Sequence, residues 1–150
     1  MKVKKKQHEQ LIQMAIVQWF RLIYPNLRDC LSASANGGKR ETKIIQTKKG
    51  TSKYCSEGAR LKKMGVLAGE LDIFISLINS AVIDNEFKVY GGLYVEVKAP
   101  GGKLTKEQKR IIKIREASGY KVNVCFAVDE AMAAIKEYME NAVLPNIIVE

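Results

Sequence analysis

The stretch GGLYVEVKAPGGKLT (residues 91–105) combines a strand pattern with two charges on one side of it. Residues 93–97 are mostly apolar, and the glycine pairs and the proline around them indicate loops. Because side chains alternate between the two faces of a strand, Glu96 and Lys98 share one face, while Val95 and Val97 share the other. A largely apolar strand therefore carries a carboxylate beside an ammonium group, which needs an explanation.

Hydrophobic periodicity predicts helices and strands in alternation around this stretch. A first helix is expected over about 7–24, ended by Pro25, with one apolar stripe made of Ile12, Ile16, Trp19, Phe20 and Ile23. A strand followed by a turn is expected within 70–79, and further strand segments are expected at 82–84, 87–90, 93–98 and 121–128. A helix over 105–118 has Thr105 as its N-cap and Gly119 as its stop. Asp129 is expected to cap a last helix through residue 140, with Ala131, Met132, Ile135 and Met139 inward.

This order predicts an α/β fold with a small mixed central sheet flanked by helices, in one domain over residues 1–150. The strand–helix–strand unit from 95 to 128 predicts a parallel crossover. Residues 32–69 are rich in Gly, Ser, Lys and Arg, and we expect a long basic loop there, with a short helix near 57–64. A polyanion-binding flap and a merely solvated surface both fit this segment.

Composition narrows the class of protein. The chain has 150 residues, and its 25 Lys and Arg against 16 Asp and Glu give a formal charge of +9, which favours nucleic acid as a partner. Three cysteines without paired spacing argue against a disulfide framework and a zinc site, and they favour a reducing cytosol. Neither a signal peptide nor a transmembrane span is expected.

The charged face of the central strand suggests a metal site. If strands 70–79 and 93–98 are adjacent, Asp72 and Glu96 converge at one edge of the sheet, where they repel each other unless a cation lies between them. Magnesium fits, since it prefers hard oxygen ligands, and the backbone carbonyl of Val97 can complete the protein side. With Lys98 beside it, the group is suited to metal-assisted phosphodiester hydrolysis. In the alternative interpretation, Glu96 and Lys98 form the exposed face of an edge strand.

Other chemistries lack their residues. His8 and Glu9 begin like a zinc-protease helix, but Ile12 stands where the second histidine would be. The Gly-Gly pairs are not followed by a P-loop or dinucleotide fingerprint, so no nucleotide cofactor is expected. His8 is the single histidine, which disfavours a histidine-assisted serine or cysteine nucleophile.

Several of these residues recur in the order that a known family shows. The chain presents Glu9, then Asn36-Gly37-Gly38-Lys39-Arg40, then Gly69-Glu70-Leu71-Asp72, then Glu96-Val97-Lys98-Ala99-Pro100-Gly101-Gly102-Lys103, then Gln108 and Gly119-Tyr120. From Glu9 to about Tyr138, this pattern resembles the VRR-NUC family of the PD-(D/E)xK nuclease superfamily. Leu71 departs from the proline that is usual there, and about 43–54 looks like extra loop.

The resemblance implies a restriction-endonuclease-like core and roles for individual residues. Asp72, Glu96 and Glu9 would hold the metal, Lys98 would act on the attacking water, and Gln108 would support the site. By its position alone, Glu9 also fits a solvated helix acid, and Gln108 fits a T-x-x-Q capping box with Thr105. Tyr120 is expected to be a packing residue. The cations expected to contact DNA are Lys39, Arg40, Arg60, Lys62, Lys63 and Lys103.

The function implied is that of a magnesium-dependent DNA endonuclease, with manganese as a substitute. Short members of the family resemble phage or prophage Holliday-junction resolvases, so we expect branched double-stranded DNA as substrate, a homodimer, and the cytoplasm of a bacterial host. The first helix or the tail at 143–149 would supply the dimer surface. A flap or restriction-type nuclease is the enzyme alternative, and a DNA-binding module without catalysis is the alternative from another class.

Overall fold

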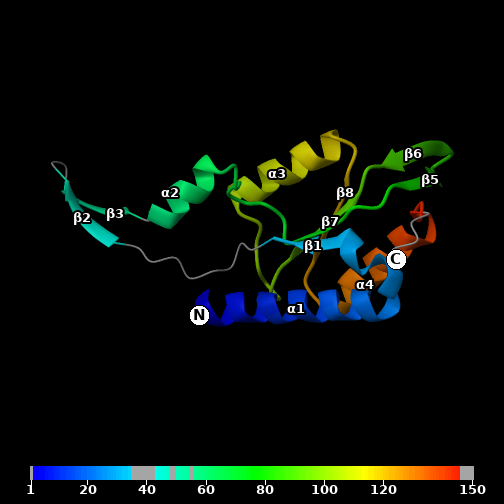
Figure 1. Ribbon diagram of the computed structural model, residues 1–150, viewed down its shortest axis with the longest axis horizontal. Helices are drawn as coiled ribbons and strands as arrows, with labels where there is room; N and C mark the ends of the chain where they lie inside the picture. The colour runs from blue at the N-terminus through cyan, green and yellow to red at the C-terminus, as the bar shows by residue number, and fades with distance from the viewer. Residues whose placement is uncertain (1, 35–42, 48–49, 55, 146–150) are drawn as a thin grey trace.

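A four-stranded sheet forms the centre of the protein, in a computed structural model that describes residues 2–34, 43–47, 50–54 and 56–145. Its strand order is β1 (Leu31–Ala33), β4 (Ile73–Ile75), β7 (Leu93–Val97) and β8 (Lys121–Cys125) (Figure 1). β4 is antiparallel to both β1 and β7, whereas β7 and β8 are parallel. The predicted mixed sheet and parallel crossover are confirmed, and β7 lies inside the sheet rather than at its edge.

Helices cover both faces of this sheet. α1 (Lys2–Ile23) and α4 (Val128–Glu140) lie on one face, and α3 (Lys106–Ala117) lies on the other (Figure 1). The core between α1, α4 and the sheet contains these buried side chains: Ile12, Ile16 and Phe20 of α1, Leu93, Val95 and Val97 of β7, and Ala131, Ile135 and Tyr138 of α4. Since alternate residues of β7 enter this core, Tyr94 and Glu96 point to the α3 face.

The prediction of a long basic loop at about 32–69 is wrong for much of that segment, which contains strands and a helix. β1 covers its start, β2 (Lys43–Thr47) and β3 (Gly50–Tyr54) pair in register as a hairpin, and α2 (Ser56–Lys63) follows. Gly50, with φ +115°, takes a conformation that favours glycine at the start of β3. The segment at 43–54 that looked like extra loop is therefore a hairpin, which extends away from the central sheet (Figure 1).

A strand followed by a turn was expected within 70–79, and the structure has a short strand there. β4 ends at Ile75, and Asn79 begins β5 (Asn79–Ile83), which pairs with β6 (Glu86–Tyr90) in a second hairpin. Asp84 and Asn85 between them have positive φ, the conformation of a tight two-residue hairpin turn. A short 3-10 helix (Pro25–Cys30) follows α1.

The structure also tests three predictions about the helices. Ile23 is 49% exposed, because the buried stripe of α1 ends one turn earlier at Phe20. Asp129 does not cap α4: the N-cap is Ala127, which makes no side-chain cap, and Glu130 accepts a hydrogen bond from the Phe126 N–H instead. The predicted helix at 105–118 is confirmed as α3, capped by Thr105. None of the helices in the described ranges is long and apolar enough to span a bilayer.

Tyr138 joins α4 to the chain between the central sheet and the second hairpin. Its side chain is 1% exposed, and its hydroxyl donates to the Leu77 carbonyl at 2.7 Å. Its own carbonyl accepts from the Asn79 side chain at 2.6 Å. We expect Tyr138→Phe to lower the free energy of unfolding by about 1–3 kcal/mol, because it leaves a buried carbonyl unpaired. Urea denaturation measures this, with Tyr24→Phe at a partly exposed ring as the control; equal losses in both variants would contradict it.

Candidate active site

Asp72 and Glu96 meet where β4 and β7 run side by side. Ile73 pairs with Val95 in the antiparallel register, so the next pair in the series places Asp72 across from Glu96. Asp72 Oδ2 accepts a hydrogen bond from the backbone N–H of Val97 at 2.8 Å. The predicted convergence of the two carboxylates follows from this pairing.

Glu96 is the most enclosed group of the site, with an exposure of 0%. Its Oε1 accepts from Lys98 Nζ at 2.5 Å and from the side-chain amide of Gln108. Its Oε2 is buried and has no hydrogen-bond partner in the described part of the chain. Lys98 is itself only 8% exposed, so the interpretation of these two residues as the exposed face of an edge strand is wrong.

Gln108 both forms the capping box with Thr105 and contacts the candidate site, the two roles that the sequence left open. Its backbone N–H donates to Thr105 Oγ1 at 3.1 Å and its Oε1 accepts from the Thr105 N–H at 3.0 Å, which together make the capping box. The remaining donor of the same side chain reaches Glu96. The cap thus fixes the orientation of the amide that holds the carboxylate.

Glu9 reaches the site from α1. Its Oε1 accepts from the backbone N–H of Ala99 at 3.1 Å, just past the end of β7. One turn later, Gln13 Nε2 donates to the Asp72 carbonyl at 3.4 Å. Sequence reasoning did not identify Gln13, since nothing local links it to Asp72. Glu9 therefore faces the strand ends rather than bulk solvent alone.

Burial and neighbouring charges raise the pKa values of Glu96 and Asp72. Desolvation, followed by the charge of Asp72, raises the pKa of Glu96 to about 7, against the lowering effect of Lys98. Desolvation also raises the pKa of Asp72, opposed by the hydrogen bond from Val97 and by Lys98, while Glu9 raises it further. A hydrogen bond with the Glu96 side chain also lowers the pKa of Asp72. The charge of Asp72 thus disfavours the charged form of Glu96, and the charge of Glu9 disfavours that of both, an effect that a cation beside them would reverse.

The donor set fits a hard divalent cation. The unpartnered Glu96 Oε2 and the carboxylate of Asp72 are oxygen ligands of the kind that Mg²⁺ accepts while it keeps several waters. Within the described ranges, no three His, Cys, Asp or Glu side chains form a complete metal cage. Ligation of a metal ion by Asp72, Glu96, Glu9 and the Val97 carbonyl stays a prediction.

Gly69 lets the chain approach α3 before it enters β4. Its φ is +81°, and a Cβ placed there would lie 2.9 Å from the backbone nitrogen of Gln108. Only glycine avoids both problems at this position. The start of α3 and the residues leading to Asp72 are consequently packed against each other, which keeps Gln108 beside the strand ends.

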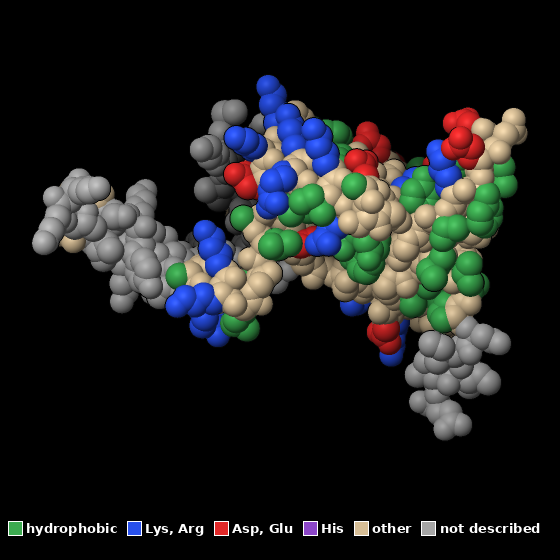
Figure 2. Space-filling view, turned by 90° about the horizontal axis from the view of Figure 1, so that it is seen from above, with side chains coloured by type: hydrophobic (Ala, Val, Ile, Leu, Met, Phe, Trp, Pro, Cys, Tyr) green, Lys and Arg blue, Asp and Glu red, His purple; other side chains and the backbone are tan. Residues whose placement is uncertain are grey.

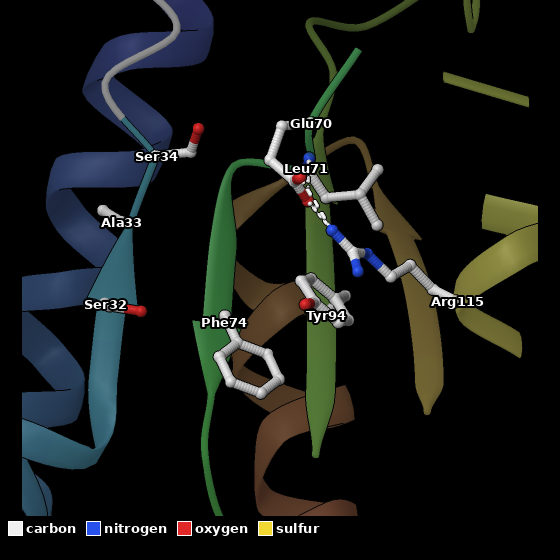
Figure 3. Close-up of a pocket in the computed structure, with 8 residues that line it drawn as sticks. All are labelled: Ser32, Ala33, Ser34, Glu70, Leu71, Phe74, Tyr94 and Arg115. Atoms are coloured by element: carbon white, nitrogen blue, oxygen red, sulfur yellow. Dashed lines mark hydrogen bonds and ion pairs between the residues drawn. The ribbon is translucent and has the colours of Figure 1, made fainter. Parts of the chain in front are cut away.

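A pocket on the α3 face of the sheet adjoins these residues (Figure 3). It is lined by Ser32, Ala33, Ser34, Glu70, Leu71, Phe74, Tyr94 and Arg115. Arg115 Nη2 and Glu70 Oε2 form an ion pair at 2.7 Å, with the guanidinium 5.0 Å from the centre of the Tyr94 ring. The predicted packing role of Tyr120 is supported by its edge contacts with Phe74 and Tyr94. Sequence reasoning missed the Glu70–Arg115 pair, whose partners are 45 residues apart.

The cations expected to contact DNA fall into three places. Arg60, Lys62 and Lys63 lie on α2, where Figure 2 shows a group of basic side chains. Lys103 is exposed just before α3. Lys39 and Arg40, with the Asn36-Gly37-Gly38 stretch before them, lie outside the described residues. Contact of any of them with DNA stays a prediction.

The pKa of Glu96 predicts how stability depends on pH without metal. The folded protein retains a proton up to about pH 7, whereas an unperturbed carboxyl loses it near 4.5. The contribution of Glu96 to the free energy of unfolding should be largest below pH 4.5. It should be lost as pH rises from 4.5 through 7, by at most about 1.4 kcal/mol per pH unit. In Glu96→Gln this dependence should flatten. Urea titrations in chelator check this, and identical pH profiles for both proteins would contradict it.

Comparison with known proteins agrees with the geometry. The family model of the VRR-NUC domain matches residues 72–129, which begin at Asp72 and include Glu96, Lys98 and Gln108. A solved structure described as a "VRR_NUC domain protein" has the same fold, with a TM-score of 0.64, 23% identity and 88% of each chain covered. The comparison with curated proteins finds no match.

The structural match extends well beyond the segment that the family model covers, and it confirms the restriction-endonuclease-like α/β core expected from the sequence. The residues that the family model matches include the strands and the helix that carry Asp72, Glu96, Lys98 and Gln108. Residues 72–129 are therefore similar to the VRR-NUC domain, and the chain shares the fold of a protein described by that name.

Proposed function

We propose that this protein is a magnesium-dependent DNA endonuclease that hydrolyses phosphodiester bonds in branched DNA. The observation that carries the proposal is the state of Glu96. One of its oxygens is held by Lys98 and Gln108, and the other is buried without a hydrogen-bond partner among the described residues. The charge of Asp72 acts on the same carboxyl group and raises its pKa. A buried anionic oxygen without a donor is costly, and a cation removes that cost.

The residues divide the work of hydrolysis between them. When bound, Mg²⁺, or Mn²⁺ in its place, would supply Lewis acidity and an acidified water at the scissile phosphate. Asp72 and Glu96 would hold the ion, and Gln108 would keep the Glu96 carboxylate in one orientation. Lys98 would orient the attacking water and stabilise the negative charge that develops on the phosphate. Glu9 would contribute a further acidic oxygen from α1.

The choice of branched DNA is supported by the resemblance to resolvases of this family and by the charge of +9. Symmetric cleavage of a four-way junction needs two active sites related by a two-fold axis, so the proposal includes a homodimer. Its setting would be the cytoplasm of a bacterial host, as a phage or prophage protein. Binding would depend on phosphate contacts and DNA shape, and would weaken steeply with salt.

Replacement of Lys98 separates catalysis from binding. We expect Lys98→Ala to lower the rate of Mg²⁺-dependent cleavage by roughly 100-fold or more, because it removes the cation at the reacting centre, while affinity for a four-way junction stays nearly unchanged. Single-turnover cleavage and gel-shift titrations measure the two quantities. Lys136→Ala, at an exposed position of α4, is the matched control and should retain both.

The substrate panel decides between the alternatives. Four-way junction, flap and linear duplex are compared with and without Mg²⁺ or Mn²⁺. If the unchanged protein cleaves none of these DNAs, the interpretation as a DNA-binding module without catalysis is favoured. A strong preference for flaps would replace the resolvase assignment with a flap nuclease.

Metal binding itself is testable without DNA. We expect Asp72→Asn to weaken Mg²⁺ binding roughly tenfold or more, since it removes one of the two carboxylate charges, of Asp72 and Glu96, that are proposed to bind the ion. Isothermal titration calorimetry compares it with Asp129→Asn, at an exposed position of α4. An unchanged affinity in Asp72→Asn would exclude Asp72 as a ligand.

A further inference from the structure

The outer face of α3 carries four cations that the site does not use. Lys106, Lys109, Arg110 and Lys113 are all exposed. At 3.6 residues per turn they fall within an arc of about 100° on the helix. Figure 2, viewed from this side, shows lysine and arginine side chains gathered over α3. We call these four residues the α3 stripe.

The α3 stripe is not neutralised by the protein. None of its four side chains takes part in an ion pair or a hydrogen bond within the described residues. Glu107 and Glu116 of the same helix lie outside the arc, one on each side. Four unpaired cations on one rigid helix repel one another, and an extended anion relieves that repulsion.

The position of the stripe relative to the active site is fixed. Gln108 joins α3 to Glu96, and Lys106 precedes Gln108 by two residues, so the stripe begins within one turn of that contact. From Lys106 to Lys113 it is about 10 Å long, at about 1.5 Å per residue. One strand of duplex DNA places about three phosphates along that length.

The stripe and the active site are on opposite sides of α3. Gln108 points to the carboxylates and Ile111 is buried toward the sheet, whereas the stripe faces solvent. A helix with its side chains is about 10–12 Å across. Phosphates bound along the stripe therefore lie at least a helix diameter away from a phosphate at Glu96 and Asp72.

We propose that the α3 stripe binds the sugar-phosphate backbone of a second duplex arm, distinct from the arm that is cut. This inference rests on the proposed function and adds to it a physical basis for branch selectivity. A junction brings a second duplex to the outer side of α3, while a linear duplex in the active site leaves the stripe unoccupied. Selectivity then comes from the distance between two binding surfaces and needs no contact with base edges.

The test removes the four charges together. Lys106→Gln, Lys109→Gln, Arg110→Gln and Lys113→Gln are combined, since glutamine keeps nearly the same helix propensity. The matched control makes the same change in net charge elsewhere, with Arg21→Gln, Arg28→Gln, Lys88→Gln and Lys136→Gln. Circular dichroism and thermal melting establish that both variants are folded.

The readout is binding in chelator to a four-way junction and to a linear duplex with the sequence of two of its arms, at several salt concentrations. For the junction, the slope of log affinity against log salt should become shallower by about 0.9 for each phosphate that the stripe neutralises, or about 2.7 for the roughly three phosphates that lie along it. The slope for the linear duplex should change much less, and the control should match the unchanged protein on both DNAs.

Two results would overturn the inference. Slopes equal to those of the control would mean that the stripe is only a solvated surface, and equal losses on both DNAs would place it on the arm that is cut. A failure of the proposed function looks different: the unchanged protein would then bind DNA without cleaving any of the panel, and the slopes would still decide whether the stripe binds an arm. If the unchanged protein binds neither DNA, both the proposed function and the role of the α3 stripe are contradicted.

Discussion

The structure depends on one buried carboxylate, in which one oxygen accepts two side-chain hydrogen bonds and the other accepts none from the described residues. Glu96 lies inside the sheet, where desolvation alone would favour its neutral form. Lys98 and Gln108 both donate to Oε1, and neither reaches Oε2. A pair of donors on a single oxygen fixes the plane of the group without satisfying it. The remaining oxygen is buried without a hydrogen-bond partner among the described residues, in a carboxyl group whose pKa is raised by the charge of Asp72.

The rest of the fold can be understood as support for that group. Antiparallel pairing of β4 with β7 brings Asp72 across from Glu96, and the capping box of α3 orients Gln108. α1 docks through two polar contacts, Glu9 with Ala99 and Gln13 with the Asp72 carbonyl, in addition to its apolar stripe. Buried polar groups of this kind reduce stability relative to an apolar core, which is a common cost of a functional site. The apolar core on the opposite face of the sheet offsets that cost with well-buried residues from α1 and α4.

Local patterns in the sequence were enough to predict the features with local causes. The strand at Glu96, the crossover and the cap at Thr105 follow from alternation, from element order and from the T-x-x-Q spacing. The resemblance added Glu9 and the support of Glu96 by Gln108, which no local pattern connects. What was missed depends on tertiary partners, as in the contact of Gln13 with the Asp72 carbonyl and the ion pair of Glu70 with Arg115. The hairpin of β2 and β3 is polar enough to look like loop. Asp129 looked like a cap because helix starts vary by a residue or two, and here Glu130 contacts the backbone instead.

The central claim is that Asp72 and the free oxygen of Glu96 receive a divalent ion between them. Crystals grown with Mn²⁺ test this most directly, through anomalous scattering collected on both sides of the manganese absorption edge. The account predicts one strong peak about 2.1 Å from Glu96 Oε2 and from an oxygen of Asp72, with Lys98 and Gln108 still on Oε1. A manganese peak elsewhere on the protein, with Glu96 Oε2 bound to a protein donor and no ion beside it, would contradict it.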